Sequence, residues 1–158
     1  MEEAGPLVLD DYLPYLLNRA GSRIAGAFTR EAQEHGLTLP MWRVLAALQE
    51  EEDRRIGELA AITSTEISTL SRVLDGLEKR ALVVRRRAAE DARTVRVRRT
   101  EAGIAVTDRL LPLARHYEEQ ALAGFEIEEI GHLKSLLRRL YDNMAVLDAE
   151  SDARPETA

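Results

Sequence analysis

Apolar residues recur at spacings of three and four along most of this chain, which predicts a mainly helical protein. A first helix is expected to run to about Glu34, with Asp10 and Asp11 as its cap and first-turn acids. His35-Gly36 is expected to end it, because glycine readily adopts the left-handed conformation that terminates helices. The apolar stripe of this helix consists of Leu13, Leu17, Ala20, Ile24, Ala27 and Phe28.

Two shorter helices are predicted next. One runs from Met41 to about Gln49, with Thr38 or Leu39 as its cap and Pro40 at its first position. The residues expected to face inward are Trp42, Leu45 and Leu48 or Ala46. Four consecutive acids at 50–53 should break this helix by like-charge repulsion and open a loop. A short helix over 57–62 then buries Leu59, Ala60 and Ile62.

The segment 63–66, Thr-Ser-Thr-Glu, has the Thr-x-x-Glu form of a capping box and predicts a helix from about Thr65 to Arg80. Its inward stripe is Ile67, Leu70, Leu74 and Leu77. Two helices joined by three or four residues are typical of a helix-turn-helix. Strands are predicted over 82–87 and 94–98, where Val95 and Val97 alternate with Arg96 and Arg98, so that 88–93 forms a hairpin tip. A helix-turn-helix followed by a basic hairpin is a winged helix.

Two long helices complete the chain. Thr100 should cap the first, which extends to about Gly124 and which Pro112 is expected to kink or break. The second runs from Glu128 to about Leu147, with an inward stripe of Ile130, Leu133, Leu137, Leu140, Met144 and Leu147. The polar tail 151–158 is expected to fray.

Composition narrows the possible functions. None of the 158 residues is a cysteine, which excludes a disulfide framework, a thiolate zinc site, an iron–sulfur cluster and a thiol redox switch. No apolar stretch approaches the roughly 18 residues of a membrane helix, so a soluble cytoplasmic protein without membrane association is expected. His35, His116 and His132 are scattered, and no metal-spaced pair, nucleophile elbow or glycine-rich phosphate loop occurs. We therefore expect that the protein is not an enzyme and that it binds no metal and no cofactor.

The net charge of −6 conceals an uneven distribution. Residues 79–99 include nine basic and two acidic residues, a net charge of +7, and the rest of the chain carries −13. A basic block on an acidic body indicates one anionic partner at one place. RNA is disfavoured because the block lacks aromatic residues for stacking against bases.

Several short segments, in this order and spacing, resemble the MarR family of bacterial winged-helix transcription regulators over nearly the whole chain. They are HGLTLPMWRVLAAL at 35–48, GELA at 57–60, STLSR at 68–72, LEKR at 77–80, EDAR at 90–93 and TEAG at 100–103. The sequence departs from the family pattern at Ser64, Ile67, Ala81 and Ala88-Ala89, where a turn glycine, a proline, a helix-ending glycine and Asp-Pro are common.

The resemblance implies a homodimer that binds a pseudo-palindromic double-stranded DNA operator sequence-specifically and represses transcription until a ligand relieves it. Residues 1–35 and 100–150 would form an intertwined dimerisation region, and 36–99 the winged helix-turn-helix. The alternative is a winged helix used for protein–protein assembly without specific DNA readout.

The predicted DNA contacts lie on the second helix of the helix-turn-helix and on the wing. Thr65, Ser68, Thr69, Arg72, Gly76 and Lys79 are expected to face outward on that helix, with Arg72 able to reach guanine or a phosphate. Arg93 at the hairpin tip suits a narrow minor groove, and Asp91 can orient it by a charge-assisted pair. Arg86 and Arg96 flank it and suit phosphates.

A ligand site is predicted from one side of the first helix, where Tyr12, Tyr15, Arg19 and Arg23 fall at helical spacing. Rings together with guanidinium groups suit a small aromatic acid, or an acyl-CoA thioester whose phosphates extra arginines would hold. Trp42 and Arg43 complete the proposed wall. Alternatively, Trp42 belongs to the core and the two arginines of the first helix pair with acids of a partner subunit.

Overall fold

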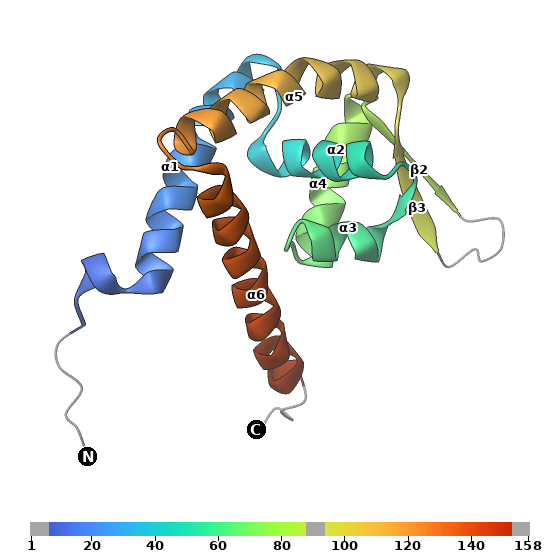
Figure 1. The fold of residues 1–158 in the computed structure, drawn as a ribbon. Coiled ribbons are helices and arrows are strands. Elements are labelled where there is room, and N and C mark those ends of the chain that lie inside the picture. Colours follow the sequence, from blue (N-terminus) through green and yellow to red (C-terminus); the bar gives the residue numbers. More distant parts are fainter. Residues whose placement is uncertain (1–6, 88–93, 153–158) are drawn as a thin grey trace. The chain divides into compact units, whose positions relative to one another are not determined.

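A computed structural model describes residues 7–87 and 94–152, and side chains as far as Met144 (Figure 1). The chain divides into two units, Met1–Glu118 and Glu119–Ala158. The helices are η1 (Leu9–Asp11, 3-10), α1 (Leu13–Glu34), α2 (Leu39–Glu50), α3 (Ile56–Ile62), α4 (Ile67–Lys79), α5 (Glu101–Ala121) and α6 (Ile127–Asp152), and the strands are β1 (Arg54–Arg55), β2 (Val83–Arg87) and β3 (Val95–Arg99). This is the mainly helical fold with a small hairpin that the sequence predicts.

The start of α1 differs from the prediction. Asp10 and Asp11 lie in the separate turn η1, and Tyr12 is the N-cap without a side-chain cap bond. Pro14 occupies the second helical position, where its missing N–H needs no partner. The aspartates are therefore not caps, and the carboxylate of Asp10 instead lies 3.5 Å from the guanidinium of Arg19.

The α1–α2 connection agrees with the prediction. Gly36 has a φ of 69°, and the N–H groups of Gly36 and Leu37 donate to the carbonyls of Gln33 and Ala32, which forms a Schellman motif. Thr38 caps α2, since its hydroxyl oxygen accepts from the N–H of Met41 at 3.4 Å. Trp42, Leu45 and Leu48 are buried as expected, whereas Ala46 is half-buried.

The sheet has three strands in the order β1-β3-β2, all antiparallel. β1 is a strand that the sequence did not predict, with Arg54 opposite Val97 and Arg55 opposite Arg96. β2 and β3 pair from Val83 opposite Arg99 to Arg87 opposite Val95, one residue off the predicted bounds. As the acidic run predicts, α2 ends at Glu50 and residues 51–53 form a short loop, which leads into β1.

The core of the first unit lies where α2, α3 and α4 meet the sheet and α1. Its fully buried members include Leu45, Leu59, Leu70, Leu74, Leu77, Val97 and Leu110. An aromatic group joins α1, α2 and α5, with the rings of Phe28 and Trp42 5.1 Å apart and those of Phe28 and Tyr117 6.3 Å apart. Ile62 is an exception, because 47% of it is exposed at the end of α3.

The beginning of α5 is fixed tightly to the start of the hairpin. The hydroxyl of Thr100 accepts from the N–H of Gly103 at 3.1 Å and donates to the carbonyl of Ala81 at 2.6 Å. The N–H of Thr100 donates to the carbonyl of Leu82 at 3.0 Å. A Cβ at Gly103 would overlap that same carbonyl, so only glycine fits there. α5 continues through Pro112 without a break.

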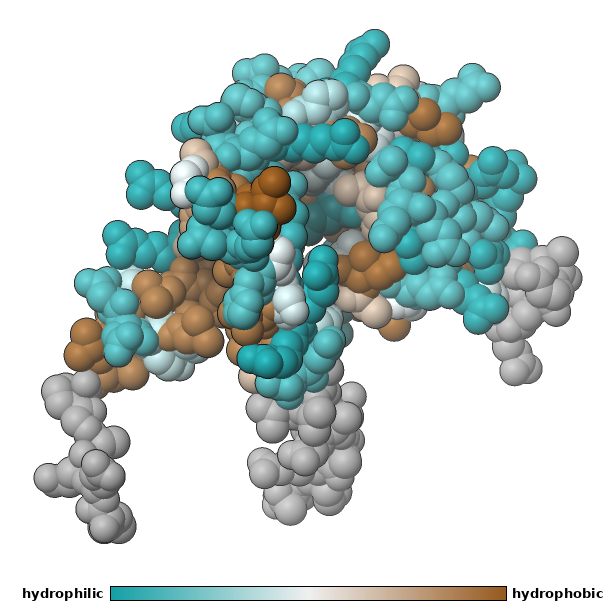
Figure 2. All heavy atoms as spheres, viewed as in Figure 1, coloured by the Kyte–Doolittle hydropathy of each residue, from teal (hydrophilic) through white to brown (hydrophobic). Residues whose placement is uncertain are grey.

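Long apolar side chains are exposed at both ends of the chain. Figure 2 shows them gathered over the start of α1, where Val8, Leu9, Tyr12, Leu13 and Leu16 are each at least 40% exposed. In the second unit Leu133, Leu137 and Met144 of α6 are exposed, and Ile130 and Leu140 half-buried. Three residues of the predicted inward stripe of α6 are therefore exposed, and the side chain of Leu147 lies outside those described.

The predicted tail begins inside α6, which includes Ser151 and Asp152, and 153–158 lie outside the described residues. Within residues 7–87 and 94–152, no helix is long and apolar enough to cross a membrane.

Candidate nucleic-acid interface

The two sides of α4 differ sharply. Leu70, Leu74 and Leu77, three of the four residues of the predicted stripe, are fully buried against the core. The opposite side exposes Ser68, Thr69, Arg72 and Lys79. Neither cation forms an ion pair within the described parts of the chain. This face offers two small hydroxyl side chains near the helix N-terminus and two unneutralised positive charges further along.

The turn before α4 is built differently from the predicted capping box. Thr63 ends α3, and its hydroxyl donates to the carbonyl of Leu59 at 2.7 Å. Ser64 has a φ of 48°, and the N–H groups of Ser64 and Thr65 donate to the carbonyls of Ala61 and Ala60. The Thr-x-x-Glu box is therefore wrong, because these residues close α3 instead of opening α4.

Three residues in and before α4 are placed differently from the prediction. Thr65 is half-buried in the turn, two residues before the helix, and its hydroxyl donates to the carbonyl of Thr63 at 3.0 Å. Gly76 does not face outward, because a Cβ there would collide with the side chain of Met41 from α2. Ile67, predicted to face inward, begins α4 and is 60% exposed.

The hairpin arginines are separated by strand alternation. Arg86, Arg96 and Arg98 share one face of the sheet with Val84, whereas Arg85 and Arg87 share the other with Val83 and Val97. Arg86, Arg87 and Arg98 are exposed and form no ion pair among the described residues. These three side chains carry the uncompensated charge of the described part of the wing.

Arg85 is held by α4 instead. Its Nε donates to Glu78 at 2.8 Å, its backbone N–H donates to the same carboxylate at 3.0 Å, and its guanidinium also bonds to Asp75. The hydrogen bond from the Arg85 side chain lowers the pKa of Glu78, and the same pairing raises the pKa of Arg85. Arg85 therefore fastens the hairpin to α4.

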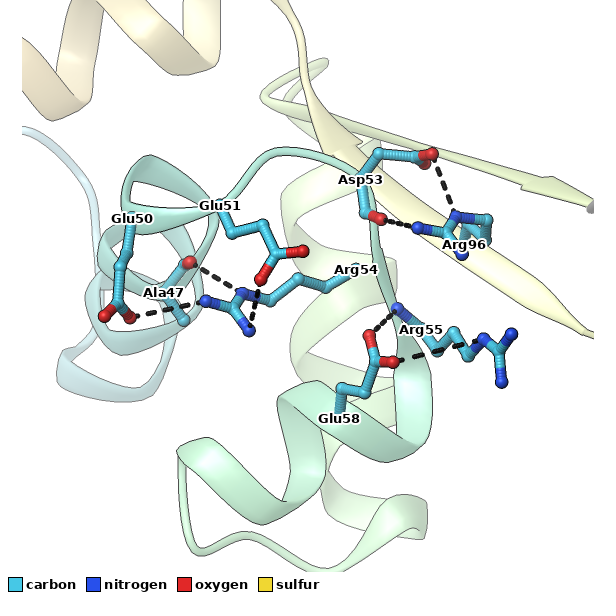
Figure 3. A network of polar contacts seen from close by, with 8 residues as sticks. All are labelled: Ala47, Glu50, Glu51, Asp53, Arg54, Arg55, Glu58 and Arg96. Carbon is cyan, nitrogen blue, oxygen red and sulfur yellow. Dashed lines mark hydrogen bonds and ion pairs between the residues drawn. The ribbon is translucent and has the colours of Figure 1, made fainter.

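Each acid of the run 50–53 pairs with an arginine, and Figure 3 shows part of this network. Glu50 and Glu51 flank Arg54, whose Nε also donates to the carbonyl of Ala47 at 3.1 Å. Asp53 has a φ of 68° and accepts from Nε of Arg96 at 2.9 Å, and its carbonyl accepts a second bond from that guanidinium.

The remaining acid of the run holds the last arginine of the hairpin. Glu52 accepts from Nε of Arg99 at 2.9 Å, and the Arg99 side chain is 7% exposed. The pairs of Asp53 with Arg96 and of Glu52 with Arg99 were not predicted from the sequence, because they join residues 43 and 47 positions apart. Four successive acids facing an arginine-rich strand were the available signal. Arg96, a predicted phosphate contact, is thus held by Asp53.

Asp91 and Arg93 lie outside the described residues, so their predicted contacts with DNA stay predictions.

Comparison with known proteins decides the family. A sequence profile of the MarR family matches residues 35–94. A crystal structure of a MarR-family transcriptional regulator from Silicibacter pomeroyi is 34% identical, with a TM-score of 0.79, over 90% of this chain and 96% of that one. The chain belongs to the MarR family.

Two further relatives are informative about function. The transcriptional repressor IacR of Pseudomonas putida is 25% identical over 138 residues, 87% of this chain and 83% of that protein. BpsR of Bordetella bronchiseptica, whose DNA binding is regulated by 6-hydroxynicotinic acid, is 25% identical with a TM-score of 0.79, over 87% of this chain and 99% of that one. Like these relatives, this MarR-family protein is a transcriptional regulator.

The departures from the MarR pattern now have a structural meaning. Ser64 and Ala81 stand where a glycine is common, and both adopt a positive φ, of 48° and 55°. Ala81 closes α4 through a Schellman motif, in which its N–H and that of Leu82 donate to the carbonyls of Glu78 and Leu77. This chain therefore adopts the left-handed backbone that glycine favours at both positions without a glycine.

The predicted ligand residues fall into two groups. Tyr12, Tyr15, Arg19 and Arg23 are all exposed on α1. Trp42 is 8% exposed and packs in the core, yet together with Arg43 it borders an open hollow of about 570 Å³ between α2 and the end of α3. Its other lining residues are Ala46, Ala47, Glu50, Ile62, Thr63 and Ser64. The α1 residues do not line this hollow.

Proposed function

We propose that this chain binds a pseudo-palindromic operator as a homodimer, with α4 in the major groove, and represses transcription. The carrying observation is the α4 face of Ser68, Thr69, Arg72 and Lys79, exposed opposite a fully buried side. Small hydroxyls allow close approach to base edges, and an arginine can bond to guanine O6 and N7. Operator binding would place the protein in the cytoplasm, and it requires no catalytic step.

The wing supports the same function. Arg86, Arg87 and Arg98 offer exposed positive charges suited to phosphates, whose neutralisation releases counterions and drives affinity. The predicted contact of Arg93 with a minor groove, oriented by Asp91, is part of this proposal on the strength of the family resemblance.

The homodimer follows from the exposed apolar side chains at both ends of the chain, such as Leu13 of α1 and Leu137 of α6. Exposed apolar surface of this extent marks an interface. Two-fold symmetry would place two α4 helices one DNA turn apart, which explains why a pseudo-palindrome is expected.

The decisive test is fluorescence anisotropy with a duplex that the protein itself selects from a random-sequence library. Arg72→Ala should weaken binding by about 1–3 kcal/mol and relax preference at one position of each half-site. Arg109→Ala is the matched control, because Arg109 is an exposed arginine of α5. Selection of no duplex at low salt would contradict the proposal and favour a protein-assembly role, whereas equal affinity of both variants would remove α4 from the interface.

We further propose that a small aromatic acid or its CoA thioester relieves repression. The hollow beside Trp42 and Arg43 combines an indole edge with a guanidinium, which suits a carboxylate on a ring. BpsR, a relative regulated by an aromatic acid, supports this class of ligand. A thermal-shift screen of phenolic acids and their CoA thioesters should reveal stabilisation that Arg43→Ala abolishes, and no shift with either class would refute it.

A further inference from the structure

Ile67 is an apolar side chain at the point where α4 begins. It is 60% exposed, although the leucines three and seven positions further along are fully buried. It differs from those leucines in being the first residue of the helix, directly after the turn that follows α3. The next two residues, Ser68 and Thr69, are also exposed.

A single exposed isoleucine is ordinary on a protein surface, so its surroundings must give it meaning. Here Ile67 is the first residue of α4, directly before the exposed hydroxyl side chains of Ser68 and Thr69. The N-terminal residues of a recognition helix are those that meet base edges in the major groove. Among those edges, the C5-methyl group of thymine is the apolar feature.

We propose that Ile67 contacts the C5-methyl group of a thymine in each operator half-site and so makes operator preference depend on that methyl. The inference rests on the proposed function, since it requires α4 to lie in the major groove. Bringing Ile67 against the methyl removes two apolar surfaces from water, and burial of one methyl-sized group corresponds to about fourfold in affinity. The adjacent hydroxyls of Ser68 and Thr69 can meet polar atoms of the same or neighbouring base pairs.

The experiment replaces each thymine of the selected duplex, one at a time, by deoxyuridine, which removes the methyl and keeps the base pairing. Binding is measured by anisotropy for the full-length protein, Ile67→Ala and Ile67→Val. For the unaltered protein, one thymine per half-site should respond with a loss of about fourfold. Ile67→Ala should bind thymine and deoxyuridine duplexes equally, and Ile67→Val should retain part of the difference.

Ile104→Ala is the matched control, because Ile104 is an exposed isoleucine of α5 that does not line the hollow beside Trp42. It should keep the full response to deoxyuridine. If no thymine responds in the unaltered protein, or if Ile67→Ala responds as strongly, the proposed contact is wrong while DNA binding stands. If no duplex is selected at all, the proposed function fails first and the contact fails with it.

Discussion

Ala81 carries a methyl group at a backbone position that favours glycine. Its φ of 55° lies in the left-handed region, where a Cβ crowds the following carbonyl at a cost of about 1–2 kcal/mol. The strain is maintained by the Schellman hydrogen bonds that close α4 and by the burial of Leu82 behind them. The helix end is thus held by its surroundings rather than by its own residue.

Ala81→Gly is expected to raise the free energy of unfolding by about 1 kcal/mol, because relief of the strain outweighs the extra freedom of the unfolded chain. Urea titration followed by circular dichroism measures the change. Ala105→Gly, at an exposed position inside α5, is the matched control and should lower stability by about 1 kcal/mol. Equal losses at both positions would show that Ala81 is not strained.

The burial of individual residues was predictable where they lie inside a helix, with further helical turns before and after them. Leu70, Leu74 and Leu77 follow a helical period inside α4 and are buried as expected. Ile62 and Ile67 follow similar spacing but lie at a helix end and a helix start, where the period no longer specifies what covers them. Helical periodicity predicts the side of the helix on which a side chain lies. It does not predict whether other elements cover that side at that position.

Among the elements, α4 and β2 are joined by the ion pair of Glu78 with Arg85. Arg85 lowers the pKa of Glu78 below its ordinary value near 4.5, so the folded state holds the ionised form more tightly than the unfolded chain does. This contribution is present above pH 4.5 and is lost as the pH falls through the lowered value. Acid should therefore loosen the attachment of the hairpin to α4.

Glu78→Gln is expected to reduce stability at pH 7, and the difference from the unaltered protein should shrink as the pH falls below about 4.5. Chemical denaturation between pH 3 and 7 measures this convergence. Glu119→Gln, which changes an exposed glutamate of α5, serves as the comparison for the loss of one negative charge. A difference that stays constant with pH would contradict the role of the Glu78 carboxylate.

On the outer face of the sheet, Arg86 and Arg96 lie directly opposite each other but have different partners. Arg86→Ala should weaken DNA binding and reduce the salt slope by about one, because an exposed phosphate-binding cation is lost. Arg96→Ala should chiefly lower thermal stability, because its guanidinium holds Asp53. Anisotropy at several salt concentrations and thermal melts separate the two effects, and the reverse pattern would assign the phosphate contact to Arg96.

The elements themselves were mostly predictable, and the exceptions share a cause. β1 has two residues, too few for any alternation, and it exists because β3 offers it an edge. The acidic run was interpreted as a repulsive helix breaker, yet its charges are compensated by Arg54, Arg96 and Arg99. Both features depend on pairings across the fold, which local sequence does not specify.

At the scale of the whole molecule, the exposed stripe of α6 predicts self-association. Leu137→Asp should convert a dimer into a monomer, because a carboxylate cannot be buried unpaired in an apolar interface. Sedimentation equilibrium at micromolar concentration measures the change. Ser135→Asp, on the opposite side of the same helix, should leave the dimer intact. A monomeric unaltered protein would remove the two-fold arrangement from the proposed function.

The distribution of charge along the whole chain indicated an anionic partner, but the structure shows that part of the basic block is neutralised within the protein. Of the basic block, Arg85, Arg96 and Arg99 are neutralised by acids from α4 and from 50–53. The distribution of charge along the chain predicts that the DNA interface includes the hairpin, and this location stays a prediction. Which arginines are available to DNA depended on three-dimensional neighbours.

The tight contact between Gly103 and the Leu82 carbonyl also constrains motion. With Thr100 bonded to both Ala81 and Leu82, the base of the hairpin and the first turn of α5 form one rigid joint. A rotation of α5 would therefore displace β2 and β3 as well. Because these strands extend away from α5, the displacement would be larger at their far ends than at the joint. A shift of a few ångströms there is enough to lose a contact with a DNA groove.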